Sequence, residues 1–291
     1  MLGTFSASWR LTKTSLRLAL TDRGLLVFPV LAGVSALVGL LLVGLAILYV
    51  PLFGGLFTAG GGSFPTVPAI VLLIALYFAV NIVSVYAWGG LVGAAMARLD
   101  GRPGTSAEGW ACARRNWKRL VVWGILAATV GLVIQLIASR ARGIVGLLLV
   151  FGAEVSWAVV TYFIVPVLIF EKEPVWRSLS RSARLYVGNF GKTLLSNLAL
   201  GLLLGLGAFA GFVLLILGSV LALGGSLALG IALLLVGAGL IVFFGILYLA
   251  ASGVLRAALY RYATTGKIDP DLLPPSVTAR APRPSAGTPL P

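Results

Sequence analysis

Six long apolar stretches constrain this chain more than any other feature. They cover residues 25–50, 67–97, 120–138, 143–170, 193–218 and 226–255. A helix needs about 20 residues to cross a bilayer, and lipid admits only helices and closed barrels as spanning structures. Continuous runs such as LVGLLLVGLAILYV lack the alternation of a barrel strand. The sequence therefore predicts an all-α integral membrane protein with six transmembrane helices.

Composition agrees with a chain whose surface is covered by lipid. Hydrophobic residues make up 59% of the sequence and charged residues only 10%, and the mean hydropathy is +1.06. So few charged side chains could not cover a soluble protein of 291 residues. The net charge of +14 sits at the ends of the apolar stretches, not in one basic patch interleaved with aromatic residues. We therefore expect anionic phospholipid, and not nucleic acid, to be the partner of these cations.

The distribution of lysine and arginine predicts an orientation, because cytoplasmic connections of membrane proteins carry an excess of these residues. With the N-terminus inside, every lysine and arginine except Arg140 and Arg142 lies on the cytoplasmic side. The outer connections near 51–66 and 219–225 carry no charge. We expect a multi-pass protein of the cell membrane with both termini in the cytoplasm.

A basic amphipathic segment, EKEPVWRSLSRSARLYVGNFGKTLL, precedes the fifth apolar stretch. Its proline suits the first turn of a helix, and the glutamates before it complement the helix dipole. An apolar set and a basic set then recur at steps of three and four residues: Trp176, Leu179, Ala183, Tyr186 and Phe190 against Arg177, Arg181 and Arg184. This pattern predicts a helix that lies on the membrane surface, with its cations toward anionic headgroups.

Similar basic segments precede the first and third apolar stretches, which indicates a repeat. Trp9 and Asp22 in the first copy have the same separation as Trp176 and Asn189 in the third, and Asn116 takes this place in a shortened second copy. Three basic surface helices, each followed by a hairpin of two spans, predict a pseudo-threefold bundle. Its units are residues 1–97, 98–170 and 171–265. Convergence of three unrelated interfacial helices is the alternative explanation.

The cations of the three basic segments are the candidates for contacts with lipid headgroups. They are Arg10, Lys13, Arg17, Arg114, Arg115, Lys118, Arg177, Arg181 and Arg184. The C-terminal residues 266–291 are rich in proline and poor in aromatic residues. We expect them to form a disordered cytoplasmic tail.

Two local features predict how the spans pack and bend. Glycines recur at four-residue spacing in the second and fifth spans, which favours close approach of helices. These glycines are Gly89 and Gly93, Gly201 and Gly205, and Gly207 and Gly211. Pro166 lies inside the fourth span and predicts a kink near its cytoplasmic end.

Several classes of chemistry are excluded by residues that the sequence lacks. Histidine is absent, which removes imidazole bases, histidine-ligated metals and Ser-His triads. The single cysteine, Cys112, allows neither an internal disulfide nor a cysteine cluster. Paired carboxylates, a glycine-rich phosphate loop and a nucleophile elbow are also missing from the sequence. We therefore expect a non-enzymatic protein with no catalytic residue, cofactor or metal.

Glu154 is the one carboxylate inside an apolar stretch, where an ionised side chain is costly and marks a functional candidate. Asn81, Gln135 and Asn197 lie at comparable depth and are its candidate polar neighbours. One hypothesis is a proton or cation site of a small carrier or channel. A second is a protonated carboxyl group that ties helices together, and a third interpretation places Glu154 toward lipid.

Two parts of the chain resemble an uncharacterised family of prokaryotic six-span membrane proteins: DRGLLVFPVLAG and VPVLIFEKEPVWRSLSRSARLYVGNFGKTL. That family is similar in pattern to the membrane domain attached to some bacterial glycerophosphodiester phosphodiesterases. The resemblance extends to about residue 265 and implies a six-helix domain of no established activity, without the phosphodiesterase barrel. We expect an accessory or scaffold protein that interacts with anionic lipid or with a membrane protein partner. The alternative is a small carrier or channel that uses Glu154.

Overall fold

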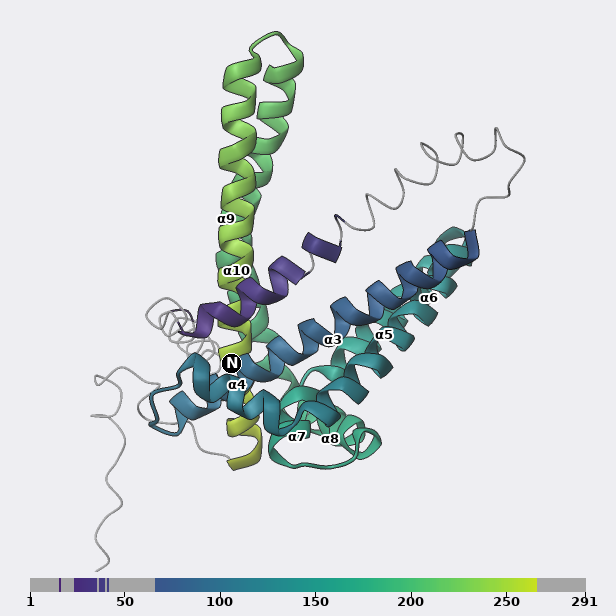
Figure 1. The fold of residues 1–291 in the computed structure, drawn as a ribbon, viewed down its shortest axis with the longest axis vertical. Helices are drawn as coiled ribbons and strands as arrows, with labels where there is room; N and C mark the ends of the chain where they lie inside the picture. The colour runs from purple at the N-terminus through teal and green to yellow at the C-terminus, as the bar shows by residue number, and fades with distance from the viewer. Residues whose placement is uncertain (1–15, 17–23, 36, 40, 42–65, 266–291) are drawn as a thin grey trace, which may run out of the picture.

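The computed structural model describes residues 16, 24–35, 37–39, 41 and 66–265, and all regular structure within them is helical (Figure 1). The helices from residue 66 onward are α3 (Thr66–Leu99), α4 (Ser106–Arg115), α5 (Trp117–Arg140), α6 (Gly143–Thr161), α7 (Ile164–Phe170), α8 (Val175–Gly188), α9 (Phe190–Leu223) and α10 (Leu227–Thr265). Five helical segments are long and apolar enough to cross a membrane. They are Val71–Leu99, Trp117–Arg140, Gly143–Phe170, Thr193–Leu223 and Leu227–Thr265.

These five segments confirm the second to sixth of the predicted spans. Of the first predicted span, residues 25–35, 37–39 and 41 are described and are helical. The remainder of that span lies outside the described residues, as do most of the basic segment before it and the tail 266–291. The sixth crossing and the pseudo-threefold arrangement therefore stay predictions.

The long helices diverge from a shared base, as Figure 1 shows. The α9–α10 hairpin forms one arm, and α3, α5 and α6 form a second arm that leans away from it. The arms meet where α4, α7 and α8 pack against the adjoining ends of the long helices. We call this region the basic end. Of the lysines and arginines in the described segment 66–265, only Arg140 and Arg142 belong to the opposite end, at the turn between α5 and α6.

The buried core lies at the basic end and not along the spans. Phe163, Leu91, Leu255 and Leu259 are fully buried within one cluster that joins α3, α7, α8, α9 and α10. In contrast, no residue of α6 is buried, and leucines and phenylalanines line the exposed surfaces of α6, α9 and α10. Exposed apolar surface of this extent is a cost in water and is favourable in lipid. The arms are therefore suited to a bilayer, and the basic end holds them together.

The fourth span is broken where Pro166 predicts a kink. The chain leaves helical geometry at Phe163, so that α6 ends at Thr161 and α7 begins at Ile164. Proline has no backbone N–H and crowds the carbonyl four residues earlier, which here belongs to Tyr162. Phe163 lies at the break itself, and its backbone N–H donates to Ser182 Oγ of α8 at 3.0 Å. The kink is confirmed, and α8 supplies the hydrogen bond that the break requires.

The junctions before α5 and α9 have the same local geometry. Asn116 lies between α4 and α5, and Asn189 lies between α8 and α9. The side-chain amides of Asn116 and Asn189 donate to the carbonyls of Cys112 and Leu185, four residues earlier, at 3.0 and 3.1 Å. The backbone carbonyl of each asparagine then accepts a hydrogen bond from the backbone N–H four residues later. Two of the three predicted repeat units thus share their junction, and the corresponding Asp22 lies outside the described residues.

Small residues let neighbouring helices approach closely at two of the predicted faces. A Cβ atom added at Gly93 would lie 2.6 Å from Cys112 Cβ of α4, and one added at Gly211 would lie 2.8 Å from the Gly237 carbonyl of α10. The prediction of close packing is confirmed at these positions. Gly201 and Gly205 have no such neighbour within 4 Å, so that part of the α9 pattern does not serve packing within the described chain.

Candidate functional site

The four intramembrane polar residues do not converge on one cavity. Glu154 is exposed on α6 and forms no hydrogen bond with a described residue, and Gln135 is exposed on α5. The Asn81 amide donates to the Tyr77 carbonyl of its own helix at 2.9 Å. Only Asn197 reaches another helix, where its amide donates to the Tyr162 hydroxyl at 2.7 Å. The hypothesis that Glu154 ties helices together therefore lacks its hydrogen bond here, and the lipid-facing interpretation fits its position.

The predicted headgroup cations have different surroundings. Arg10, Lys13 and Arg17 lie outside the described residues. Arg114, Arg115, Lys118, Arg177 and Arg184 are exposed at the basic end, while Arg181 is half-buried. None of the described carboxylates forms an ion pair with Arg114, Lys118 or Arg184. These side chains remain able to contact anions from outside.

The face that α8 turns toward the protein differs from the predicted apolar face. Ser178, Ser182, Leu185 and Tyr186 are its buried residues, whereas Trp176 is 72% exposed. The two serines face inward because they hydrogen-bond backbone groups: Ser182 accepts from Phe163, and Ser178 donates to the Glu173 carbonyl at 3.3 Å. The periodicity of α8 alone could not predict that serines lie on its buried face. They are needed there because the break in the preceding span leaves backbone groups that require hydrogen-bond partners.

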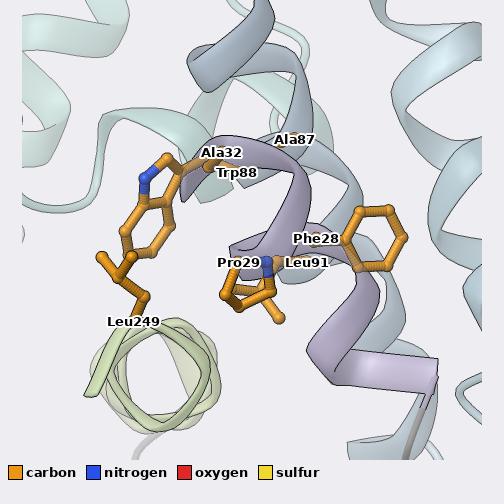
Figure 2. Close-up of a pocket in the computed structure, with 7 residues that line it drawn as sticks. All are labelled: Phe28, Pro29, Ala32, Ala87, Trp88, Leu91 and Leu249. Carbon is orange, nitrogen blue, oxygen red and sulfur yellow. The ribbon is translucent and has the colours of Figure 1, made fainter. Parts of the chain in front are cut away.

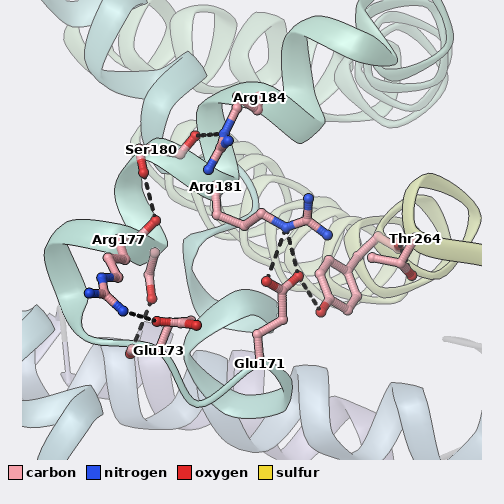
Figure 3. Close-up of polar contacts among 9 residues, drawn as sticks. Glu171, Glu173, Arg177, Ser180, Arg181, Arg184 and Thr264 are labelled. Carbon is pink, nitrogen blue, oxygen red and sulfur yellow. Dashed lines mark hydrogen bonds and ion pairs between the residues drawn. The ribbon is translucent and has the colours of Figure 1, made fainter.

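Glu171 forms a polar junction between α7, α8 and α10, which Figure 3 shows. Both of its carboxylate oxygens accept from Arg181 Nε, at 3.1 and 3.0 Å. The Tyr260 hydroxyl of α10 donates to the same carboxylate at 3.2 Å. Arg181 therefore forms an internal contact, unlike the other described headgroup candidates, and its contact with lipid stays a prediction. In the same view Glu173 pairs with Arg177 near solvent, at 3.7 Å.

We expect double-mutant cycles to show that the Arg181–Glu171 pair contributes more to stability than the exposed Arg177–Glu173 pair. Arg181→Gln and Glu171→Gln should show a coupling energy of about 1 kcal/mol, because the Glu171 carboxylate is only partly hydrated and accepts two further contacts when Arg181 is present. The matched control is Arg177→Gln with Glu173→Gln, whose exposed pair should couple by only about 0.3 kcal/mol. Reversible unfolding in detergent provides the measurement. Equal coupling in the two cycles would show that the Glu171 junction does not stabilise the basic end.

Arg256 of α10 was counted in the sequence only as a cytoplasmic charge, yet it lies between helices. Its guanidinium carbon lies 4.7 Å from the ring centroid of Trp88 on α3 and 4.8 Å from that of Tyr162. Cation–π contact of this kind stabilises a partly desolvated guanidinium. Its Nε atom is buried without a hydrogen-bond partner among the described residues. Arg256 thus joins the two arms, and only the spatial proximity of Trp88 and Tyr162 reveals it.

An apolar pocket lies beside the same tryptophan, between residues 24–35, α3 and α10 (Figure 2). Phe28, Pro29, Trp88 and Leu249 line it, together with Ala32, Ala87 and Leu91. Its volume is about 10 Å³, which is close to the minimum for one water molecule, and its walls offer no polar partner. This pocket is a packing defect of the core and not a ligand site.

Tryptophans and cations occur together on the outer surface of the basic end. Trp117, at the start of α5, is 51% exposed, and the Lys118 ammonium lies 5.8 Å from its ring centroid. Trp176 and Arg177 are exposed neighbours on α8. Tryptophan favours the boundary between hydrocarbon and headgroups, where cations meet lipid phosphate. We call Arg114, Trp117, Lys118, Trp176, Arg177 and Arg184 the interfacial set, and it is the candidate functional site.

Five apolar helices that could span a membrane, held at one basic end, define an all-α multi-pass membrane protein. Among the described side chains no group of three or more histidine, cysteine, aspartate or glutamate residues could hold a metal ion. Residues 67–269 match the model of a family of unknown function (DUF6159), and the chain belongs to that family. No curated protein matches the chain, and no solved structure matches it.

Proposed function

We propose that this protein is a non-enzymatic accessory or scaffold protein of the cell membrane that binds anionic phospholipid at its basic end. In this proposal the chain crosses the membrane six times, as three hairpins in a pseudo-threefold arrangement. Both termini and the basic end face the cytoplasm. A membrane protein partner would then be recruited to a patch of bound anionic lipid.

The observation that carries the proposal is the interfacial set. It combines exposed tryptophans with four exposed cations, of which Arg114, Lys118 and Arg184 have no carboxylate partner among the described residues and Arg177 pairs only with Glu173 near solvent. Each cation near an anionic leaflet is worth about 1 kcal/mol. Both tryptophans lie close in the chain to an apolar span, because Trp117 begins α5 and α8, which contains Trp176, leads directly into α9. Headgroup phosphates and these cations would therefore meet at one depth.

Two further observations support the orientation and the symmetry. Cations of the described helices gather at one end, and the positive-inside rule assigns such an end to the cytoplasm. The shared asparagine junctions before α5 and α9 support a repeated unit of surface helix and hairpin. The first copy would comprise the N-terminal segment, residues 25–50 and α3.

A carrier or channel built on Glu154 is the less favoured proposal. Such a protein needs a polar path in which the carboxylate faces its partners. Glu154, Asn81, Gln135 and Asn197 have separate neighbours within the described chain, and Glu154 points outward. The interfacial set, in contrast, brings exposed tryptophans and cations together, as binding of anionic phospholipid requires.

Retention of anionic lipid tests the proposal. We expect the variant Arg114→Gln/Lys118→Gln/Arg177→Gln/Arg184→Gln to copurify with at least tenfold less phosphatidylglycerol. Four cations contribute about 1 kcal/mol each, and salt screens a part of this sum. Lipid mass spectrometry of the protein in detergent gives the ratio of phosphatidylglycerol to phosphatidylethanolamine. Arg140→Gln/Arg142→Gln is the matched control, because it removes two cations from the opposite end. Equal lipid ratios in wild type, variant and control would contradict lipid binding by the interfacial set.

A further inference from the structure

A cavity of about 650 Å³, open to the outside, lies at the basic end between α3, α4, α5 and the end of α7. Four cationic side chains line it: Arg102, Arg115, Arg119 and Lys172. Its volume falls within the roughly 300–1,000 Å³ of pockets that hold small ligands. Apart from Arg115, none of these cations belongs to the predicted headgroup candidates. Only the packing of α4 across α3 and α5 brings them together.

The lining carries an uncompensated positive charge. Its one carboxylate, Glu108, is already engaged: Glu108 Oε2 accepts from the Thr105 backbone N–H at 3.2 Å, and Glu108 Oε1 lies 3.8 Å from Arg102. Arg119 donates only to the Asn116 side-chain oxygen, at 3.3 Å. No described carboxylate forms an ion pair with Arg115, Arg119 or Lys172. Three cations therefore line a shared space without an ion pair to a carboxylate of the described chain.

The remaining polar groups of the wall do not offset this charge. Burial raises the pKa of the Cys112 thiol, against a smaller lowering effect of Arg115 and Arg102. The thiol is therefore neutral at physiological pH and contributes no negative charge. Asn116 directs its amide to the Cys112 carbonyl. Gly93 and Ile169 complete the wall without polar side chains.

Lys172 has a backbone conformation that a lysine rarely adopts. Its φ is +57°, and it is the one non-glycine residue with positive φ in the described chain. This left-handed geometry is favourable for glycine and strained for a residue with a Cβ atom. Strained residues of this kind cluster at functional sites, where the surrounding structure holds them in place. Here it accompanies a lysine at the cavity wall, between α7 and α8.

We infer that this cavity binds an anion with two phosphate groups. A guanidinium group can donate two parallel hydrogen bonds to the oxygens of one phosphate, and a lysine ammonium adds a further positive charge. Two arginines and a lysine, Arg115, Arg119 and Lys172, therefore match two phosphates better than one. Two sources share this chemistry: the headgroup of a phospholipid with two phosphodiesters, and a soluble diphosphate. Basic pockets at the cytoplasmic ends of membrane helices bind such headgroups. The lipid source rests on the proposed function, whereas the soluble source does not.

Binding by the full chain in detergent tests the inference with two probes, inorganic pyrophosphate by calorimetry and cardiolipin by native mass spectrometry. We expect the wild type to bind at least one probe saturably. Arg115→Gln/Lys172→Gln should weaken that binding at least 30-fold, since it removes two charge-assisted contacts. Arg140→Gln/Arg142→Gln removes two cations from the opposite end of the described helices, outside both the cavity and the interfacial set, and should change the affinity by less than threefold. Lys172→Gly should raise the melting temperature yet weaken binding, because glycine relieves the strain and removes the charge.

Each outcome has a defined meaning. Saturable cardiolipin binding that depends on the cavity cations supports the lipid source, and the same result with pyrophosphate alone supports the soluble source. Absence of saturable binding of both probes overturns the inference, as does equal weakening by the cavity and control variants. A Lys172→Gly protein that binds as tightly as wild type also overturns it. If the four-cation variant of the interfacial set retains as much phosphatidylglycerol as wild type, only the proposed function is contradicted. That variant leaves the cavity cations unchanged.

Discussion

Phe163→Ala is expected to lower the free energy of unfolding by about 3–5 kcal/mol, the range for truncating a buried phenylalanine. Phe163 is fully buried where α6 and α7 separate. Its ring lies between those of Tyr162, Tyr186 and Tyr260, with centroid distances of 4.7, 6.5 and 6.4 Å. Loss of this ring would leave a cavity where α7, α8 and α10 meet. Reversible unfolding by SDS in detergent micelles measures the effect.

Phe243→Ala is the matched control for this experiment. Phe243 has the same side chain but is 55% exposed on α10, outside the basic end. In detergent its truncation should cost less than about 1 kcal/mol, because detergent already covers the ring and no protein cavity forms. Comparable destabilisation by the two substitutions would show that stability is spread along the spans and does not come from the basic end.

Glu154→Leu is expected to improve membrane insertion of the fourth span by about 3 kcal/mol. Glu154 is exposed in the middle of α6 and has no hydrogen bond with a described residue. A charged residue at the centre of a spanning helix costs about 2.5–3.5 kcal/mol on insertion scales, whereas leucine is favourable. A glycosylation-reporter assay of segment 143–161 gives the apparent insertion free energy. Val155→Leu, at the neighbouring exposed position, should change insertion by less than about 0.5 kcal/mol.

Thermal stability of the full chain separates lipid exposure from a structural role. Glu154→Leu should leave the melting temperature in detergent unchanged or higher, because no described partner loses a hydrogen bond. A marked decrease in the leucine variant, restored by Glu154→Gln, would show that the carboxyl group donates a hydrogen bond in the assembled protein. In that case the exposed face of α6 would have a polar partner.

The spans and their breaks could be predicted from the sequence because each depends on local properties. Uninterrupted apolar runs identified the five described spanning segments. Pro166 predicted the kink because a missing N–H acts on its own helix. Asn116 and Asn189 were aligned as equivalent, and their amides cap the preceding helices in the same way. In each case the residues that determine the structure are neighbours in the chain.

The candidate site depends on contacts between segments that are distant in the sequence. The periodicity of a single helix gives no information about such contacts. Arg181 pairs with Glu171, although both were expected at the membrane surface. Arg256 is held by rings from two other helices. The inward face of α8 contains serines because a carbonyl and an N–H elsewhere need partners. These outcomes follow from which helices meet at the basic end, and the sequence pattern of a single helix does not specify its neighbours.

Within the described part of the chain, the α9–α10 hairpin packs against the other helices at the basic end alone, so it can act as a lever. The stretch of α9 from Gly205 to Leu223 is about 27 Å long at 1.5 Å per residue. A rotation of about 10° at its base would therefore displace the tip by about 5 Å across that length. A lateral force on this tip would therefore exert a torque on the helices that contact Arg256 at the base of the hairpin.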